Sequence, residues 1–229
     1  MTRKAGVYSS AARTEWVNTQ PVFSKRELLI KSYQVMQRWE SNYMKSLAAV
    51  ATSCGGNVLE VGFGMGISAR FIQQSKTIRS HSIIECHPTI VSHAARELRN
   101  EIKAGRVRLL HGFWEQVTRG MGAKSFDGIL FDSCPLESGV EFFQFFPFFK
   151  EAFRLLKDDG VFTYFSDEPL DISKPHLQEL RKAGFANVGF KICRVRPPKT
   201  CEYWKHDTLV VPIVRKHLPP PRGNSQHDI

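Results

Sequence analysis

Three alternating glycines directly follow a short apolar run in the stretch LEVGFGMG, residues 59–66. Glycine has no Cβ, so the backbone of such a turn can come close to a ligand at the N-terminus of a following helix. The dinucleotide fingerprint G-x-G-x-x-G is not met, because Ile67 stands where its last glycine would be. Glu85 follows about 20 residues later, where a carboxylate can accept hydrogen bonds from both hydroxyls of a ribose. Turn and acid together predict a nucleoside-binding site.

A second candidate for chemistry is Asp132, which ends an apolar run in the stretch FDSCP, residues 131–135. A carboxylate near a reacting centre suits a cationic acceptor such as a guanidinium, whose N–H groups form a planar fork. A guanidinium is a weak nucleophile because it keeps its proton. A carboxylate bonded to the attacking nitrogen can take that proton as the new bond forms. The neighbouring Cys134 has no histidine placed beside it by a motif, so we do not expect a cysteine nucleophile.

The segments that position these residues alternate between strand and helix. We expect strands at residues 58–61, 82–85, 107–110, 126–131 and 161–165, with helices at 67–74, 89–103 and 142–156. This alternation predicts right-handed βαβ crossovers and an α/β, doubly wound, mostly parallel sheet. A helix at 175–183 precedes strands at 188–195 and 208–214, which no helix separates. The sheet should therefore have seven strands and an antiparallel edge.

The segments outside this core carry weaker patterns. Residues 1–25 show no sustained period, which predicts an irregular arm with a few buried anchors. From Lys25 to Val50 apolar residues recur at steps of three and four, which predicts an amphipathic lid helix. We therefore expect an N-terminal arm and lid helix at 1–50, a core at 51–217 and a disordered tail at 218–229.

Composition limits the function classes. The chain has 229 residues and a net charge of +10, which by itself favours an anionic partner such as nucleic acid. Its five cysteines are scattered without a C-x-x-C pair, so we expect neither disulfides nor a metal site. No apolar run is long enough for a signal peptide or a membrane span, so we expect a soluble cytoplasmic protein without a membrane partner. Six phenylalanines at 142–149 cover more than one helix face and leave a homo-oligomer open.

Several longer motifs resemble one family. They are VMQRWESNYM at 35–44, GGNVLEVGFGM at 55–65, IIEC at 83–86, FWE at 113–115 and FDGILFD at 126–132. Together they look like guanidinoacetate N-methyltransferase and its arginine-methylating relatives, over about residues 30–215. The glycine spacing also resembles the first motif of class I methyltransferases. The resemblance implies a Rossmann-like class I methyltransferase fold, with S-adenosyl-L-methionine as cofactor and S-adenosyl-L-homocysteine as product.

The resemblance also implies roles for individual residues. Glu40 and Asp132 would hold and deprotonate the guanidinium; without the family, Glu40 would be taken for a solvated helix residue. The cofactor contacts would be Met36, Met44, Phe63, Gly64, Met65, Gly66, Ile67, Ser68, Glu85, Cys86, His87, Trp114, Glu115 and Asp132. Trp16 would belong to the lid.

The chain departs from the guanidinoacetate enzymes near the expected acceptor. Where their loop after the fifth strand offers uncharged residues, this chain has Asp167 and Glu168, and two acids favour an amine over a carboxylate. The segment after that loop is shorter, and Cys134 replaces the family's tyrosine, which leaves more room. The expected substrate contacts are Trp16, Glu40, Asp132, Cys134, Asp167 and Glu168.

We therefore expect a methyltransferase that acts on the guanidino group of a small molecule. Arginine, β-arginine or a guanidine-containing specialised metabolite, as in antibiotic biosynthesis, fits better than guanidinoacetate. Methylation of guanidinoacetate to creatine and an RNA- or protein-directed activity stay as alternatives. Because the expected site is acidic, the positive charge is assigned to the outer surface and no nucleic acid partner is expected.

Overall fold

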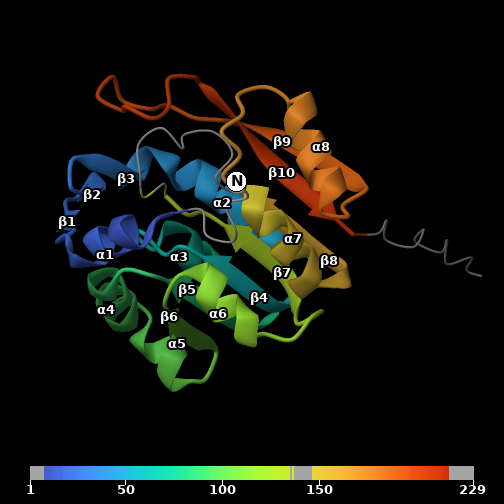
Figure 1. Ribbon diagram of the computed structural model, residues 1–229, viewed down its shortest axis with the longest axis horizontal. Coiled ribbons are helices and arrows are strands. Elements are labelled where there is room, and N and C mark those ends of the chain that lie inside the picture. Colours follow the sequence, from blue (N-terminus) through green and yellow to red (C-terminus); the bar gives the residue numbers. More distant parts are fainter. Residues whose placement is uncertain (1–7, 135, 137–145, 217–229) are drawn as a thin grey trace, which may run out of the picture.

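The computed structural model describes residues 8–134, 136 and 146–216, which form two β-sheets and the helices around them (Figure 1). The large sheet has seven strands in the order β6-β5-β4-β7-β8-β10-β9. They are β4 (Gly56–Val61), β5 (Ile78–Glu85), β6 (Val107–His111), β7 (Phe126–Phe131), β8 (Leu156–Tyr164), β9 (Asn187–Arg194) and β10 (Thr208–Arg215). Strands β4 to β8 are parallel, while β10 pairs antiparallel with β8 and β9. The expected doubly wound sheet with an antiparallel edge is confirmed.

Each face of this sheet packs against its own helices. Val58 contributes to one apolar core with α2 (Ser41–Ala51) and α3 (Ile67–Gln74), whereas Leu59 points into a second core with α7 (Phe146–Leu155) and α8 (Lys174–Lys182). The other helical segments are α4 (Pro88–Glu97), α5 (Arg99–Lys103), α6 (Trp114–Val117) and the 3-10 turns η1 (Arg38–Glu40) and η2 (Thr118–Gly120). Because both faces are covered, the central strands are largely continuous apolar runs.

The N-terminal part differs from the prediction. The expected irregular arm contains helix α1 (Ser10–Asn18), with Ala12 and Trp16 buried four residues apart. The first half of the expected lid helix forms strands β2 (Glu27–Ile30) and β3 (Tyr33–Gln37), which make a small antiparallel sheet with β1 (Val22–Phe23) of the expected arm. Only its second half is helical, as α2. The prediction of one long helix was therefore wrong.

Two short strands account for the apolar pattern that predicted this helix. Leu28 and Ile30 alternate as fully buried residues on β2, and Met36 is buried opposite Leu28 on β3. Lys31 turns the chain between the strands with a φ of 56°, which a right-handed helix does not contain. Both strands turn one face toward the same core, so the buried positions imitate helical spacing.

Three further boundaries differ. Strand β8 begins at Leu156, so Asp158-Asp159-Gly160 lies inside the strand instead of ending a helix, and the pairing with β7 shifts register there. The helix expected at 89–103 is divided into α4 and α5 at Leu98. Residues 142–145 and the tail at 218–229 lie outside the described residues, whereas Phe148 and Phe149 are fully buried in the core. In the part of the chain described here, no helix is long and apolar enough to cross a membrane.

The turn from β4 into α3 depends on a close crossing of two backbone segments. Gly62 has a φ of +89°, and a Cβ at this position would lie 1.9 Å from the carbonyl oxygen of Asp132. The Asp132 N–H in turn donates to the Val61 carbonyl at 2.9 Å. A side chain at residue 62 would therefore push the glycine turn away from the strand end that carries Asp132.

We predict that Gly62→Ala lowers the free energy of unfolding by about 3 kcal/mol or more, since it adds a backbone collision to an unfavourable φ. Gly105→Ala is the matched control, because Gly105 has a φ of +72° and a Cβ added there would meet nothing within 4 Å. That variant should lose only about 1 kcal/mol. Urea denaturation measures both. Equal losses would show that the close crossing at Gly62 has no energetic weight.

Candidate active site

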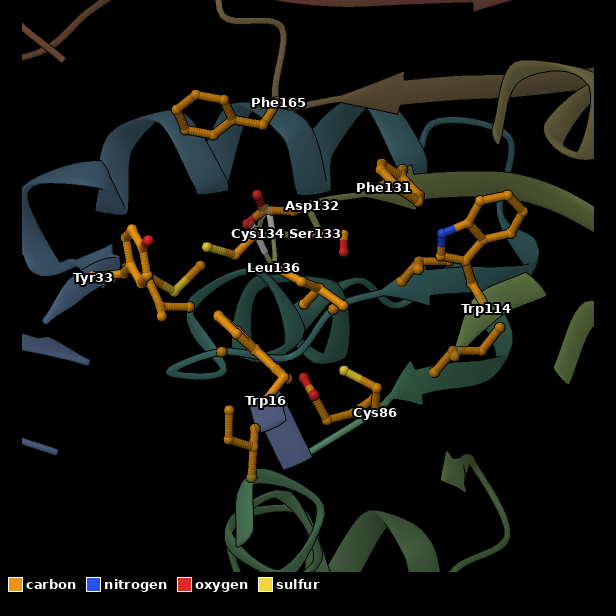
Figure 2. Close-up of a pocket in the computed structure, with 18 of the residues that line it drawn as sticks. Trp16, Tyr33, Cys86, Trp114, Phe131, Asp132, Ser133, Cys134, Leu136 and Phe165 are labelled. Carbon is orange, nitrogen blue, oxygen red and sulfur yellow. The ribbon is translucent and has the colours of Figure 1, made fainter. Parts of the chain in front are cut away.

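The carboxyl ends of β4, β5 and β7 border a cavity of about 530 Å³, which residues of α1, β3 and the loop between β9 and β10 also line. Figure 2 shows Asp132, Ser133 and Cys134 between Tyr33 on one side and Trp114 on the other. The described lining holds six acidic residues and no lysine, arginine or histidine; the acids are Glu40, Glu85, Glu115, Asp132, Asp167 and Glu202. The cavity is large enough for small ligands, and its charge is opposite in sign to that of the whole chain.

Glu85 is fixed at the end of β5 by two backbone N–H groups. Its carboxylate accepts from Phe63 N at 3.0 Å and from His87 N at 2.8 Å, one bond to each oxygen. The side chain is 7% exposed and lines the cavity. Each carboxylate oxygen keeps a second lone pair, so Glu85 can still accept from a ligand hydroxyl.

The glycine turn packs against β3 through a methionine. The thioether sulfur of Met36 lies 3.3 Å from Met65 N, which donates to it, and covers the open side of Gly64. Met36 and Gly64 both line the cavity. Behind the turn, Ser68 Oγ donates to the buried carboxylate of Glu60. The turn is therefore fixed from both sides.

An aromatic wall and an ion pair close the far side of the cavity. Trp114 packs edge to face on Phe131 and Phe148, with ring centroids 6.2 and 5.1 Å away. Glu115, next in sequence, forms an ion pair of 2.6 Å with Arg13 of α1. This pair ties α1 to α6 and keeps the buried Trp16 at the cavity wall.

The two acids expected to handle a guanidinium lie on different elements. Glu40 ends η1 just before α2 and is 2% exposed; its Oε1 accepts from Gln37 N at 2.6 Å and from Tyr203 Oη. Burial raises the pKa of Glu40 to about 7, although both hydrogen bonds oppose the shift. Asp132 follows β7, and burial together with the charges of Glu40, Glu60 and Asp167 raises its pKa well above the usual value. No basic residue of the described lining compensates these acids.

Of the other residues expected to contact the substrate, three line the cavity and one does not. Trp16, Cys134 and Asp167 line the cavity. Burial and nearby acids raise the pKa of the Cys134 thiol, which favours its neutral form over the nucleophilic thiolate. Glu168 points elsewhere: its Oε1 accepts from Ser173 N at 3.1 Å and lies 3.4 Å from His176 Nδ1. The loop therefore offers the cavity one acid rather than two.

Several residues expected to touch the cofactor lie behind the cavity wall. His87 is buried and its ring bonds to the Thr19 carbonyl at 2.8 Å, which connects α4 to the end of α1. Cys86, Trp114 and Glu115 line the cavity as expected. The expected residues outside its lining are Met44, Phe63, Met65, Gly66, Ile67, Ser68, His87 and Glu168. Phe63 and Met65 contribute through the backbone bonds described above.

Apart from Met36, sequence reasoning missed the cavity wall formed by β3 and the β9–β10 loop. Gln34 bridges these segments, since its side chain donates to the Thr200 carbonyl at 2.9 Å and accepts from Glu202 N at 2.8 Å. The Tyr203 ring packs against Trp39 in a tilted arrangement, with ring centroids 5.9 Å apart, and its hydroxyl donates to Glu40. The one sequence feature that could have indicated this wall is the aromatic pair Tyr203 and Trp204, which lies in a segment without the alternating pattern of a strand.

Comparison with known proteins gives one family. A family model described as guanidinoacetate N-methyltransferase matches residues 9–217. The chain is 31% identical to protein arginine N-methyltransferase 2 of Emericella nidulans, over 80% of this chain and 43% of that protein. It is 28% identical to the protein of the same name from Saccharomyces cerevisiae, over 80% of this chain and 46% of that protein. The chain thus spans about half the length of these curated relatives.

Solved structures share the fold at low sequence identity. Spermidine synthase from Thermotoga maritima aligns with a TM-score of 0.66 and 16% identity, covering 88% of this chain and 74% of that one. TYW2 from M. jannaschii in complex with AdoMet aligns with a TM-score of 0.56 and 15% identity, covering 86% and 84%. These similarities establish the architecture of the sheet and its helices.

The raised pKa of Glu40 makes a prediction about stability. The folded protein keeps the Glu40 proton up to about pH 7, whereas the unfolded chain keeps it only to about pH 4.5. Unfolding therefore releases this proton between the two pH values, and the free energy of unfolding falls as pH rises. Glu40→Gln removes this effect and keeps an oxygen for Tyr203. Its stability advantage over the natural protein should grow by about 2 kcal/mol between pH 5.5 and 8.5 in urea denaturation.

The control is Glu15→Gln, because the Glu15 side chain is 63% exposed. Its difference from the natural protein should hardly change with pH. If the Glu40→Gln difference is also constant with pH, or shrinks, Glu40 is not held in the folded protein as a raised-pKa acid.

Proposed function

The chain belongs to the guanidinoacetate N-methyltransferase family, and from this premise we propose that it transfers a methyl group from S-adenosyl-L-methionine to a guanidino nitrogen of a small molecule. The observation that carries the proposal is the pair of the buried Glu40 and the half-buried Asp132, which line one cavity whose described lining holds no basic residue. Such a pair is stabilised by a ligand that brings a cation with several N–H donors.

The cavity residues fit this cofactor. Glu85 has free lone pairs for two ribose hydroxyls, and Trp114 offers an aromatic surface for adenine. Gly64 lines the cavity, and the three atoms nearest to the position of a Cβ there belong to the flexible side chain of Met36. When bound, S-adenosyl-L-methionine supplies an electrophilic methyl group on a positively charged sulfur. The acidic lining favours that charge.

The two acids have different environments and therefore different roles. Glu40 is oriented by Gln37 N and Tyr203 Oη, so we assign it to anchoring two guanidinium N–H groups. Asp132 stands at the strand end next to the glycine turn, and we assign it to the attacking nitrogen. There it accepts the N–H hydrogen bond and takes the proton as the new C–N bond forms. Holding the nitrogen against the methyl group supplies much of the remaining acceleration.

The acceptor we propose is a small guanidine such as arginine, β-arginine or a related specialised metabolite, in preference to guanidinoacetate. The acidic lining, with Asp167 at the loop after β8, repels a substrate carboxylate. A second candidate is arginine within a protein, because the fungal relatives are named protein arginine N-methyltransferase 2. RNA is disfavoured, since the described lining offers no basic side chain for phosphates.

A panel of acceptors distinguishes these substrates. The purified chain is incubated with S-adenosyl-L-methionine and free arginine, guanidinoacetate or an arginine-containing peptide, and methylated products are measured by mass spectrometry. We predict that free arginine is methylated with a kcat/KM at least about tenfold above that of guanidinoacetate. Preference for guanidinoacetate would contradict the small-molecule proposal, and preference for the peptide would support the protein-directed candidate.

Asp132→Asn tests the proton transfer. We predict a fall in kcat of about 10²- to 10⁴-fold, the usual contribution of general base catalysis, with S-adenosyl-L-methionine still bound in calorimetry. Asp159→Asn is the control, since Asp159 is exposed on β8. Asp132→Asn with near-natural kcat would remove Asp132 from the catalytic role.

A further inference from the structure

Asp167 occupies a fixed position on the cavity wall. Ser166, before it, donates through Oγ to the Val210 carbonyl at 2.7 Å and through N to Tyr43 Oη at 3.2 Å. Glu168, after it, accepts from Val210 N at 2.8 Å through its carbonyl. Between these anchors Asp167 has a φ of 54°, in the left-handed region that aspartate tolerates better than most residues. Its backbone position is therefore set by both neighbours.

The Asp167 carboxylate is left without a partner among the described residues. It lines the cavity but forms no hydrogen bond or ion pair with them. Burial, and then the charge of Glu168, raises its pKa to about 7. A buried acid in this state is stabilised when a cation reaches it.

No basic side chain of the described cavity lining can serve as that cation, and two other acids of the lining have partners of their own. Glu115 is neutralised by Arg13, and Glu85 is held by two backbone N–H groups. A guanidinium bound by Glu40 and Asp132 brings one positive charge. These two acids share that charge, so it does not neutralise Asp167. Asp167 adds to the negative potential at Asp132, so it lies near the acceptor end of the cavity.

We infer that Asp167 forms a second cation subsite, which binds a primary ammonium group carried by the same guanidine substrate. This inference rests on the proposed function and narrows its substrate class to guanidines with a free amine. The guanidinium occupies Glu40 and Asp132, and the ammonium donates charge-assisted hydrogen bonds to Asp167. The single acid at the end of a fixed loop then selects for the amine, while Glu168 stays engaged with Ser173 and His176.

Agmatine and pentylguanidine test the subsite, because they differ by an ammonium group in place of a terminal methyl. Methyl transfer is measured at pH 8, where Asp167 is charged. We expect a kcat/KM for agmatine at least about tenfold above that for pentylguanidine. Asp167→Asn should reduce this ratio about tenfold or more. Asp167→Gly should do the same, and glycine suits the positive φ if asparagine disturbs folding.

Glu202→Gln is the matched control, since it removes one acid from the same cavity lining. Its agmatine to pentylguanidine ratio should stay near that of the natural protein. A ratio near one in the natural protein, or a ratio lost in Glu202→Gln but kept in both Asp167 variants, overturns the subsite. If the subsite is overturned but both guanidines are methylated, the proposed function still holds. If no guanidine is methylated in any assay, the proposed function itself is contradicted.

Discussion

The structure depends on negative charge that the protein does not neutralise from within. Glu40, Asp132 and Asp167 come from three distant parts of the chain and meet at one cavity without a basic residue in its described lining. Burial raises the pKa of all three, and the charges of Glu40 and Asp167 raise that of Asp132 further. Such an arrangement is costly in the free protein and is relieved by a cationic ligand, which is the physical basis of the selectivity for guanidines that we propose.

The fold places these acids by separate means. The parallel sheet sets Asp132 at the end of β7, where the close crossing with Gly62 joins it to the glycine turn. The small N-terminal sheet brings η1 and Glu40 to the cavity, and Tyr203 from the β9–β10 loop fixes the Glu40 side chain. The loop after β8 carries Asp167 between two anchored neighbours. The residues we propose for catalysis and for specificity are thus held by different elements, so Asp167 can vary while Glu40 and Asp132 are kept.

The sequence predicted the parts of this molecule that depend on local order. The strand, glycine turn and Glu85 share a short span, and their alternation with helices is enough to specify the sheet. The N-terminal hairpin was mistaken for helix because Leu28, Ile30 and Met36 face a core that other segments supply. The hydrogen bond from Tyr203 to Glu40 and the contacts of Glu168 with Ser173 and His176 are tertiary contacts, which no local sequence pattern encodes. Glu40 was found only through the family resemblance.

The most direct test of this account is the number of protons released when a guanidine binds. Titration calorimetry of agmatine into the chain with S-adenosyl-L-homocysteine, at pH 7 in buffers of different ionisation enthalpy, measures that number. Because Glu40 has a pKa of about 7 when no cation is bound, we predict release of at least about half a proton per chain. The value should fall in Glu40→Gln. Binding without proton release, or with proton uptake, would contradict the claim that unneutralised carboxylates receive the guanidinium.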